Sequence, residues 1–137
     1  PRAEALGLPI HFKQACASAT GFPDASFDLV VSNILLHEIP RDMLEAVMQE
    51  SFRLLKPGGL VVHQDVPTQR PDTPAFQQWL SSWQVAHNDE PFWQSFAETS
   101  VPDALISAGF SVESVFESYQ PQIDGPLVWY MVGACKP

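Results

Sequence analysis

A strand, a helix and a second strand between residues 27 and 64 constrain the fold of this 137-residue chain more than any other feature. Residues Phe27 to Ser32 (FDLVVS) are apolar on both faces of a short run, which is typical of a strand in the middle of a parallel sheet. Residues Leu60 to Gln64 (LVVHQ) read as a second buried strand. A strand, helix, strand unit of this length predicts a right-handed crossover between parallel strands, and so an α/β fold.

The helix between these strands is predicted to begin at Asp42 and to end before Pro57. Asp42 can accept hydrogen bonds from first-turn amides, and Glu45 follows at the spacing of a capping box. One stripe of side chains recurs at the helical period: Leu44, Val47, Met48, Ser51, Phe52 and Leu55. Pro57-Gly58-Gly59 predicts the end of the helix, because proline cannot continue it and glycine can adopt a left-handed conformation.

The remaining segments predict further helices and strands around this unit. We expect the tail of a helix at Ala3 to Leu8 and a helix that begins at a Thr73 cap, with Pro74 at its first position. We also expect a short helix at Pro91 to Ala97 and a further helix from Ser100 to Ala108 that Gly109 ends. We expect strands at Ile10 to Gln14, Phe110 to Phe116 and Leu127 to Ala134. The last two strands are joined without room for a helix, so they should be antiparallel.

Composition excludes several classes of function. A formal net charge of −9 disfavours a nucleic-acid partner, because phosphate backbones are bound by basic faces. No apolar run of about 18 residues predicts a membrane span, and the first residues do not read as a signal peptide. Cys16 and Cys135 lack metal-ligand spacing, which favours free thiols in a reducing cytoplasm.

Two segments together carry a resemblance to a known family. The run PDASFDLVVSNILLHEIP, followed by LLKPGGLVVHQD, resembles the middle of class I S-adenosylmethionine-dependent methyltransferases. Ala108-Gly109-Phe110, before an antiparallel pair, resembles the end of the same domain. The resemblance covers nearly the whole chain and the C-terminal two-thirds of the family domain. It implies a partial Rossmann-like sheet, mostly parallel with an antiparallel C-terminal strand pair and helices on both faces.

The resemblance also implies cofactor contacts at the carboxyl edge of the sheet, where open α/β folds bind ligands. Ser32 and Asn33 would lie beside the methionine part of S-adenosylmethionine, unless they are ordinary polar residues at a strand end. Cys16 occupies the position at which the family usually has an acid bound to the adenine amino group. A thiol is a poor acceptor, so we expect weaker adenine binding there, through the backbone of Cys16 and Ala17.

Histidines supply the candidates for a general base. His37 follows the strand that ends at Ser32, and it could contact the cofactor, act as a base, or serve only in a hydrogen-bonded loop. His63 lies inside a predicted buried strand and is expected to be structural. Glu38 and His87 are further candidates, and the histidines and acids show no metal-ligand spacing on one helix face.

An aromatic-rich segment at about residues 70–100 is the clue to the acceptor. It contains Trp79, Trp83 and Trp93, and insertions at this place in the family often cover the active site. A pocket walled by these rings would suit a flat or apolar acceptor. Aromatic residues at helical spacing can equally pack a helix onto the sheet.

One absence limits what the chain is expected to do alone. The sequence has no Gly-x-Gly turn, and the first two strands of the family domain are missing. The apolar edge of the strand at Phe27 to Ser32 would then be uncovered, which is an aggregation hazard. Three explanations fit: the chain is a fragment of a longer protein, a second chain completes the sheet, or the fold is rearranged. We favour the fragment, in which residues 1–137 form a single, incomplete methyltransferase domain. Such a fragment is expected to have little affinity for the cofactor.

Two functions therefore stay open. The first is methyl transfer from S-adenosylmethionine to a small-molecule acceptor in the cytoplasm, with neither nucleic acid nor membrane as partner. The second is a non-catalytic methyltransferase-like module for binding or assembly, which Cys16 slightly favours. Half of a dinucleotide dehydrogenase is disfavoured, because the Lys-Pro-Gly-Gly turn and the antiparallel ending occur together in methyltransferases.

Overall fold

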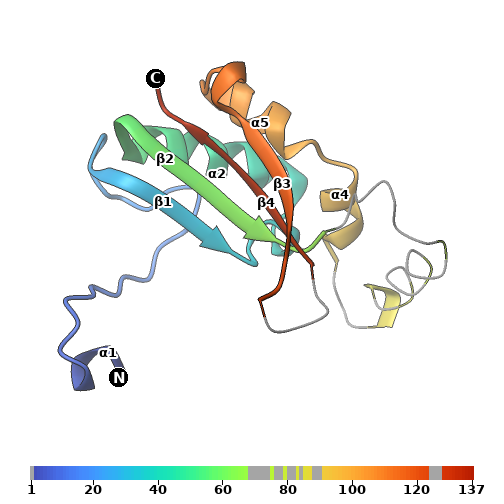
Figure 1. Cartoon of the computed structure of the whole chain (residues 1–137), viewed down its shortest axis with the longest axis horizontal. Helices are drawn as coiled ribbons and strands as arrows, with labels where there is room; N and C mark the ends of the chain where they lie inside the picture. The colour runs from blue at the N-terminus through green and yellow to red at the C-terminus, as the bar shows by residue number, and fades with distance from the viewer. Residues whose placement is uncertain are drawn as a thin grey trace.

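The protein folds around one mixed sheet of four strands (Figure 1). The computed structural model describes residues 2–67, 75, 79, 83, 85–87, 91–123 and 128–137. The strands are β1 (Phe27–Asn33), β2 (Leu55–Asp65), β3 (Phe116–Pro121) and β4 (Val128–Cys135), in the spatial order β1-β2-β4-β3. β1 and β2 are parallel, and β4 runs antiparallel to both of its neighbours, so the predicted parallel pair and antiparallel ending are both confirmed.

The helices supply most of the core on one face of this sheet. These helices are α2 (Arg41–Leu54), α4 (Trp93–Ala97) and α5 (Val101–Ala108). A further helix, α1 (Arg2–Ala5), has no buried residue, and the 3₁₀ turns are η1 (Leu36–Glu38) and η2 (Val112–Ser114). α2 and α5 pack against each other. Their buried side chains meet alternate residues of the two central strands, and the core comprises Leu44, Val47, Met48, Leu105, Val61, Val132 and Ala134 among others.

The opposite face of the sheet is open in the described part of the chain. Helices were expected on both faces, but α2 and α5 share one face (Figure 1). On the other face Leu29 and Val31 of β1 are 53% and 59% exposed. In the strand order β1 is an edge strand among the described residues, as the absence of the first two family strands predicted.

The ends of α2 differ from the sequence prediction. The helix starts at Arg41 after Pro40, and no side chain caps it, so the predicted Asp42 cap is wrong: Asp42 lies one residue inside the helix. The helix ends at Leu54, and Pro57, Gly58 and Gly59 lie within β2.

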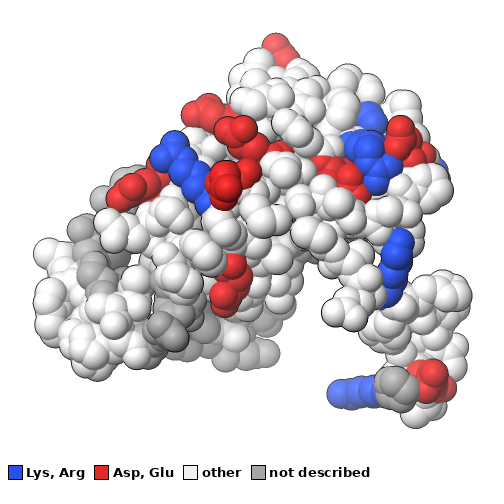
Figure 2. Space-filling view, turned by 180° about the vertical axis from the view of Figure 1, so that it is seen from behind, with Lys and Arg blue, Asp and Glu red and all other residues white. Residues whose placement is uncertain are grey.

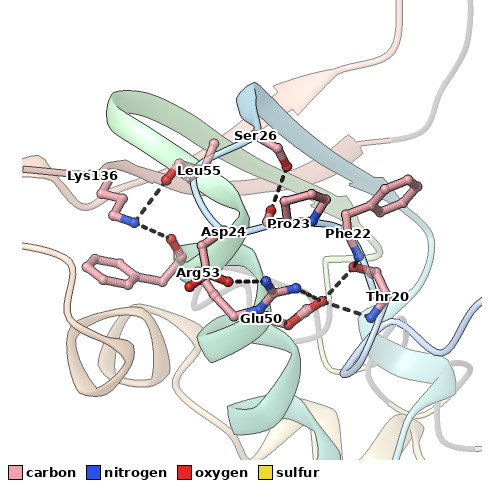
Figure 3. Close-up of polar contacts among 10 residues, drawn as sticks. Thr20, Phe22, Pro23, Asp24, Ser26, Glu50, Arg53, Leu55 and Lys136 are labelled. Atoms are coloured by element: carbon pink, nitrogen blue, oxygen red, sulfur yellow. Dashed lines mark hydrogen bonds and ion pairs between the residues drawn. The ribbon is translucent and has the colours of Figure 1, made fainter.

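Hydrogen bonds to the C-terminal end of the chain explain why Gly58 and Gly59 belong to β2. Gly58 N–H donates to the Lys136 carbonyl (2.9 Å), and Lys136 N–H donates to that of Gly59 (2.8 Å). The Lys136 ammonium also donates to the carbonyls of Phe52 and Leu55, as Figure 3 shows. Cations are favourable at helix C-termini, so Lys136 both extends the pairing of β2 and caps α2.

Two predicted strands are corrected. Residues 10–14 form no strand, because no described strand lies beside them to exchange backbone hydrogen bonds. Ile10 and Phe12 are instead 52% and 76% exposed. Between Phe110 and Phe116 the chain forms the turn η2, in which the Ser114 hydroxyl donates to the Ser111 carbonyl, so only Phe116 enters a strand.

The predicted helix at Ser100 to Ala108 is confirmed together with both of its end signals. The Ser100 hydroxyl accepts from the Asp103 amide, as its position in a capping-box spacing predicts. Gly109 ends α5 at φ 114°, a left-handed conformation that glycine adopts without a Cβ penalty. The short helix predicted at Pro91 to Ala97 is α4, whereas the Thr73 and Pro74 cap lies outside the described residues.

A buried carboxylate ties the loop before β1 to α2 (Figure 3). Glu50 is 7% exposed and accepts from the amide and the hydroxyl of Thr20, at 2.8 and 2.6 Å. Arg53 donates to Glu50 and also pairs with Asp24. The Arg53 hydrogen bond, followed by those from Thr20, lowers the pKa of Glu50 from 4.5 to about 2.

This network predicts a pH dependence of stability. Because the pKa of Glu50 is lower in the folded chain, its contribution is complete above about pH 4.5 and is lost as pH falls towards 2. With allowance for the solvent exposure of Arg53, we expect Glu50→Gln to cost about 2 kcal/mol at pH 7. Urea unfolding at pH 7, 4 and 2.5 checks this. If the difference in unfolding free energy between the variant and the native chain did not decrease at acidic pH, the prediction would be wrong.

Candidate functional site

The carboxyl ends of β1 and β2 meet at a buried carboxylate that the sequence did not single out. Asp65, the last residue of β2, is fully buried. Its Oδ2 accepts from the amides of Leu35 (3.1 Å) and Leu36 (2.7 Å), and its Oδ1 accepts from the amide of Val66 (2.7 Å). The turn after β1 is therefore fastened to the end of β2 by one side chain.

His37 lies between this carboxylate and the surface. Its Nδ1 is 2.5 Å from Asp65 Oδ1, and its Nε2 is 3.4 Å from Oε1 of Glu38. His37 is 4% exposed, whereas the Glu38 side chain is 54% exposed. The three groups thus form a polar path from the core to solvent, through the residue that the sequence proposed as pocket residue or base.

Trp93 holds the other side of the imidazole. The ring of Trp93, at the start of α4, packs edge-on against His37 with centroids 5.3 Å apart and planes at 69°. This is one of the three tryptophans that the sequence assigned to the acceptor segment. The structure therefore brings a candidate acceptor residue to the candidate base, from elements more than fifty residues apart in the chain.

The backbone at Ile34, between β1 and η1, is strained. Ile34 has φ 54°, a left-handed conformation that a β-branched residue adopts only when its surroundings impose it. Its N–H donates to the Gln64 carbonyl (2.8 Å), and the next two amides donate to Asp65. The hydrogen bonds on both sides of Ile34 thus fix the corner that carries Asn33 and His37.

Ile34→Gly tests this strain. Glycine removes a cost of about 1–3 kcal/mol for the left-handed backbone and adds an entropic cost of about 0.5–1 kcal/mol. Because the variant also loses the burial of a side chain that is 40% exposed, we expect little net change of stability in urea unfolding. The control is Leu29→Gly, an exposed apolar residue of the same strand, which should lose about 1 kcal/mol. Equal losses in both variants would show that Ile34 stores no strain.

Ser32 contacts a second buried histidine. The hydroxyl of Ser32 is 2.7 Å from Nδ1 of His63, its partner across the β1–β2 pair. His63 is 1% exposed, which confirms its predicted burial, and this burial lowers its pKa to about 4. Its Nε2 has no hydrogen-bond partner in the described part of the chain. The ring is therefore neutral near pH 7, and Ser32 is engaged by it at the site edge.

Cys16 and Ala17 lie in a turn before β1, and Ala17 packs against the core. Cys16 pairs with Ala19 in an isolated bridge, and its Sγ is 3.1 Å from the Ser18 hydroxyl. The Ser18 hydroxyl, more than any other group, lowers the pKa of this exposed thiol. Thr20 then anchors the turn to Glu50 of α2. No described contact joins this turn to Ser32, Asn33 or His37.

The aromatic segment divides between surface and core. Trp79 and Trp83 are 59% and 48% exposed, and the ring of Trp83 stacks on His87 with centroids 4.3 Å apart. Phe96 is 4% exposed and belongs to the core. Trp93, which contacts His37, lies between these extremes.

Surface charge is mixed and acidic. On the face shown in Figure 2, opposite to the view of Figure 1, basic side chains stand singly and mostly beside acidic ones. Among the described residues, Arg53 pairs with Asp24 and Glu50, and Lys56 pairs with Asp28. None of the helices in the described ranges has the length and apolar character needed to cross a bilayer.

The chain is similar in sequence to known methyltransferases. Residues 1–63 match the family described as a methyltransferase domain. A polyketide synthase-nonribosomal peptide synthetase, TwmB of Talaromyces wortmannii, is 35% identical over 115 residues, which are 78% of this chain and 4% of that protein. An uncharacterized methyltransferase of Synechocystis is 31% identical over 101 residues, 74% of this chain and 46% of that protein. The chain thus spans less than half of each of these relatives.

Solved structures show the same fold. The 1,6-didemethyltoxoflavin-N1-methyltransferase of Burkholderia thailandensis, solved with 1,6-didemethyltoxoflavin and S-adenosylhomocysteine, aligns with a TM-score of 0.62. The alignment has 18% identity and covers 99% of this chain and 55% of that one. At this identity the match establishes the partial Rossmann-like fold.

Proposed function

We propose that this chain, which is similar to a methyltransferase domain over residues 1–63, is part of a cytoplasmic class I S-adenosylmethionine-dependent methyltransferase that methylates a small molecule. The observation that carries this proposal is the joint edge of β1 and β2. There Ser32 and Asn33 end β1, the turn at Ile34 follows, and His37 lies beyond it with Trp93 beside its ring. Open α/β sheets bind their ligands at this edge.

Ser32 and Asn33 are the residues we assign to the methionine part of S-adenosylmethionine. The half-buried hydroxyl of Ser32 and the exposed Asn33 offer the polar atoms that this part of the cofactor requires. The backbone of Cys16 and Ala17 would meet the adenine. When bound, the cofactor supplies an electrophilic methyl group on a sulfonium, and the chain's own residues position an acceptor in line with it.

The acceptor is proposed to be flat or apolar. Trp93 provides an aromatic wall beside His37, and Trp79 and Trp83 carry further exposed aromatic rings in the same segment. The Burkholderia relative was solved with a heteroaromatic compound, 1,6-didemethyltoxoflavin, which supports this class of acceptor. For a nitrogen or oxygen acceptor, His37 is the candidate base. The acidic surface, with net charge −9, supports an acceptor other than nucleic acid.

Calorimetric titration with S-adenosylmethionine tests the incomplete-domain part of the proposal. The fit of the cofactor is partial, because Cys16 offers a thiol and the sequence has no Gly-x-Gly turn. We expect little or no binding by the 137-residue chain. Micromolar binding would contradict the view that it is a fragment of the enzyme.

A non-catalytic module is the second candidate, and Cys16 at the adenine position favours it. The coding sequence upstream of Pro1 separates the two. A strand followed by Gly-x-Gly-x-Gly, on a longer chain that binds S-adenosylmethionine, would support the enzyme. A longer chain that lacks this turn and does not bind the cofactor would support the module.

A further inference from the structure

We propose that Asp65 is a positioning residue for His37: it fixes the proton of the imidazole on Nδ1 and so leaves Nε2 as the nitrogen that can accept a proton. The use of Nε2 as a base rests on the methyltransferase function proposed above. The arrangement of Asp65 and His37 is independent of that function, because it follows from the hydrogen bonds of the folded chain.

The partners of Asp65 show which way its bond to His37 runs. Three backbone amides, those of Leu35, Leu36 and Val66, point their N–H groups at its two oxygens. A protonated acid could donate only to His37 Nδ1, because the other three partners are themselves donors, whereas the carboxylate, the ordinary form of an aspartate at neutral pH, accepts from all four. The fourth partner, His37 Nδ1 at 2.5 Å, is therefore the donor, and Asp65 holds the ring in one tautomer.

The other partners of the ring orient Nε2. Glu38 Oε1 is 3.4 Å from Nε2 and lies at the surface, so this end of the imidazole faces outward from the core. Trp93 packs edge-on against the ring and limits its rotation. The imidazole is thus held by Asp65 at Nδ1 and by the edge of Trp93, and its Nε2 lies on the side of the ring where Glu38 reaches the surface.

This geometry gives a defined proton transfer. When an acceptor O–H or N–H bond breaks, its electron pair stays on the acceptor atom, and the proton forms a new bond to Nε2. The resulting imidazolium lies between the carboxylates of Asp65 and Glu38, which stabilise its charge. The proton can then leave to solvent past the exposed Glu38. A histidine with the opposite tautomer could not accept this proton at Nε2.

The experiment is nitrogen NMR of the imidazole rings in the 15N-labelled 137-residue chain, with His37→Gln to assign the His37 signals. At the alkaline end of a pH titration, where the ring carries one proton, we expect Nδ1 to be the protonated nitrogen and Nε2 the bare one. A native spectrum with Nδ1 bare would overturn the proposal, even if no variant folds.

Asp65→Asn is expected to reverse this tautomer. The single amide oxygen of asparagine is needed by the amides of Leu35 and Leu36, so its NH₂ group faces Nδ1, which must then accept. Glu50→Gln, which amidates a buried carboxylate elsewhere, is the matched control and should leave the His37 signals unchanged. An Asp65→Asn variant that keeps the native tautomer would overturn the proposal. Absence of cofactor binding in a longer chain would instead count against the methyltransferase function, with the tautomer result unaffected.

Discussion

Gly133→Ala is expected to destabilise the chain by about 3 kcal/mol or more, because β4 has no room for a side chain at this position. An added Cβ would lie 2.2 Å from the Val61 carbonyl oxygen and 2.6 Å from Cζ of Phe116. Val61 belongs to the backbone of β2, which pairs with β4 on one side and β1 on the other. Neither β2 nor β4 can move away without breaking the backbone hydrogen bonds to its neighbouring strands. Urea unfolding followed by circular dichroism measures the loss.

A second substitution separates the two clashes. Phe116 is 40% exposed and its ring lies over Gly133, so Phe116→Leu in the Gly133→Ala background removes the side-chain clash only. We expect partial recovery relative to Gly133→Ala, because the clash with the Val61 carbonyl remains. If Gly133→Ala alone lost less than about 0.5 kcal/mol, the tight approach of β2 and β4 at this position would be wrong.

Leu105→Ala is expected to lose about 2–5 kcal/mol. Leu105 is fully buried in the core between α5, α2 and the sheet. Truncation removes its transfer free energy and leaves a cavity that rigid neighbours on both layers cannot fill. The measurement is the midpoint of urea unfolding at constant slope.

The neighbouring residue provides the control for this prediction. Ile106 has a side chain of the same size on the same helix but is 38% exposed. Ile106→Ala should therefore lose less than about 1 kcal/mol, since much of its surface is already in water. Similar losses for both variants would mean that α5 does not pack through Leu105.

The central strands, α2, α5 and the antiparallel ending could be predicted because each has a local signal. β1 and β2 are unbroken apolar runs, and α5 carries its cap at Ser100 and its stop at Gly109. The predictions that were wrong concern segments whose structure depends on contacts with residues distant in the sequence. α2 ends early because Lys136 pairs with Gly58 and Gly59, and residues 10–14 form no strand because no described strand lies beside them.

The candidate site shows the same limit. His37 could be proposed from its place after a buried strand. Its contact with Trp93 could not be predicted, because the two residues are fifty-six positions apart in the sequence. Asp65 gave no signal, since an acid after LVVHQ looks like an ordinary strand end. Its role depends on accepting from residues about thirty positions earlier, a relation set by the parallel register of β1 and β2.

The bonds of the Lys136 ammonium have a consequence for the order of synthesis. This residue donates to the carbonyl groups of Phe52 and Leu55, more than eighty residues earlier in the chain. Until residue 136 has left the ribosome, the last turn of α2 lacks these partners and β2 lacks its pairing at Gly58 and Gly59. The end of the helix therefore acquires its full set of hydrogen bonds only after this segment has been translated.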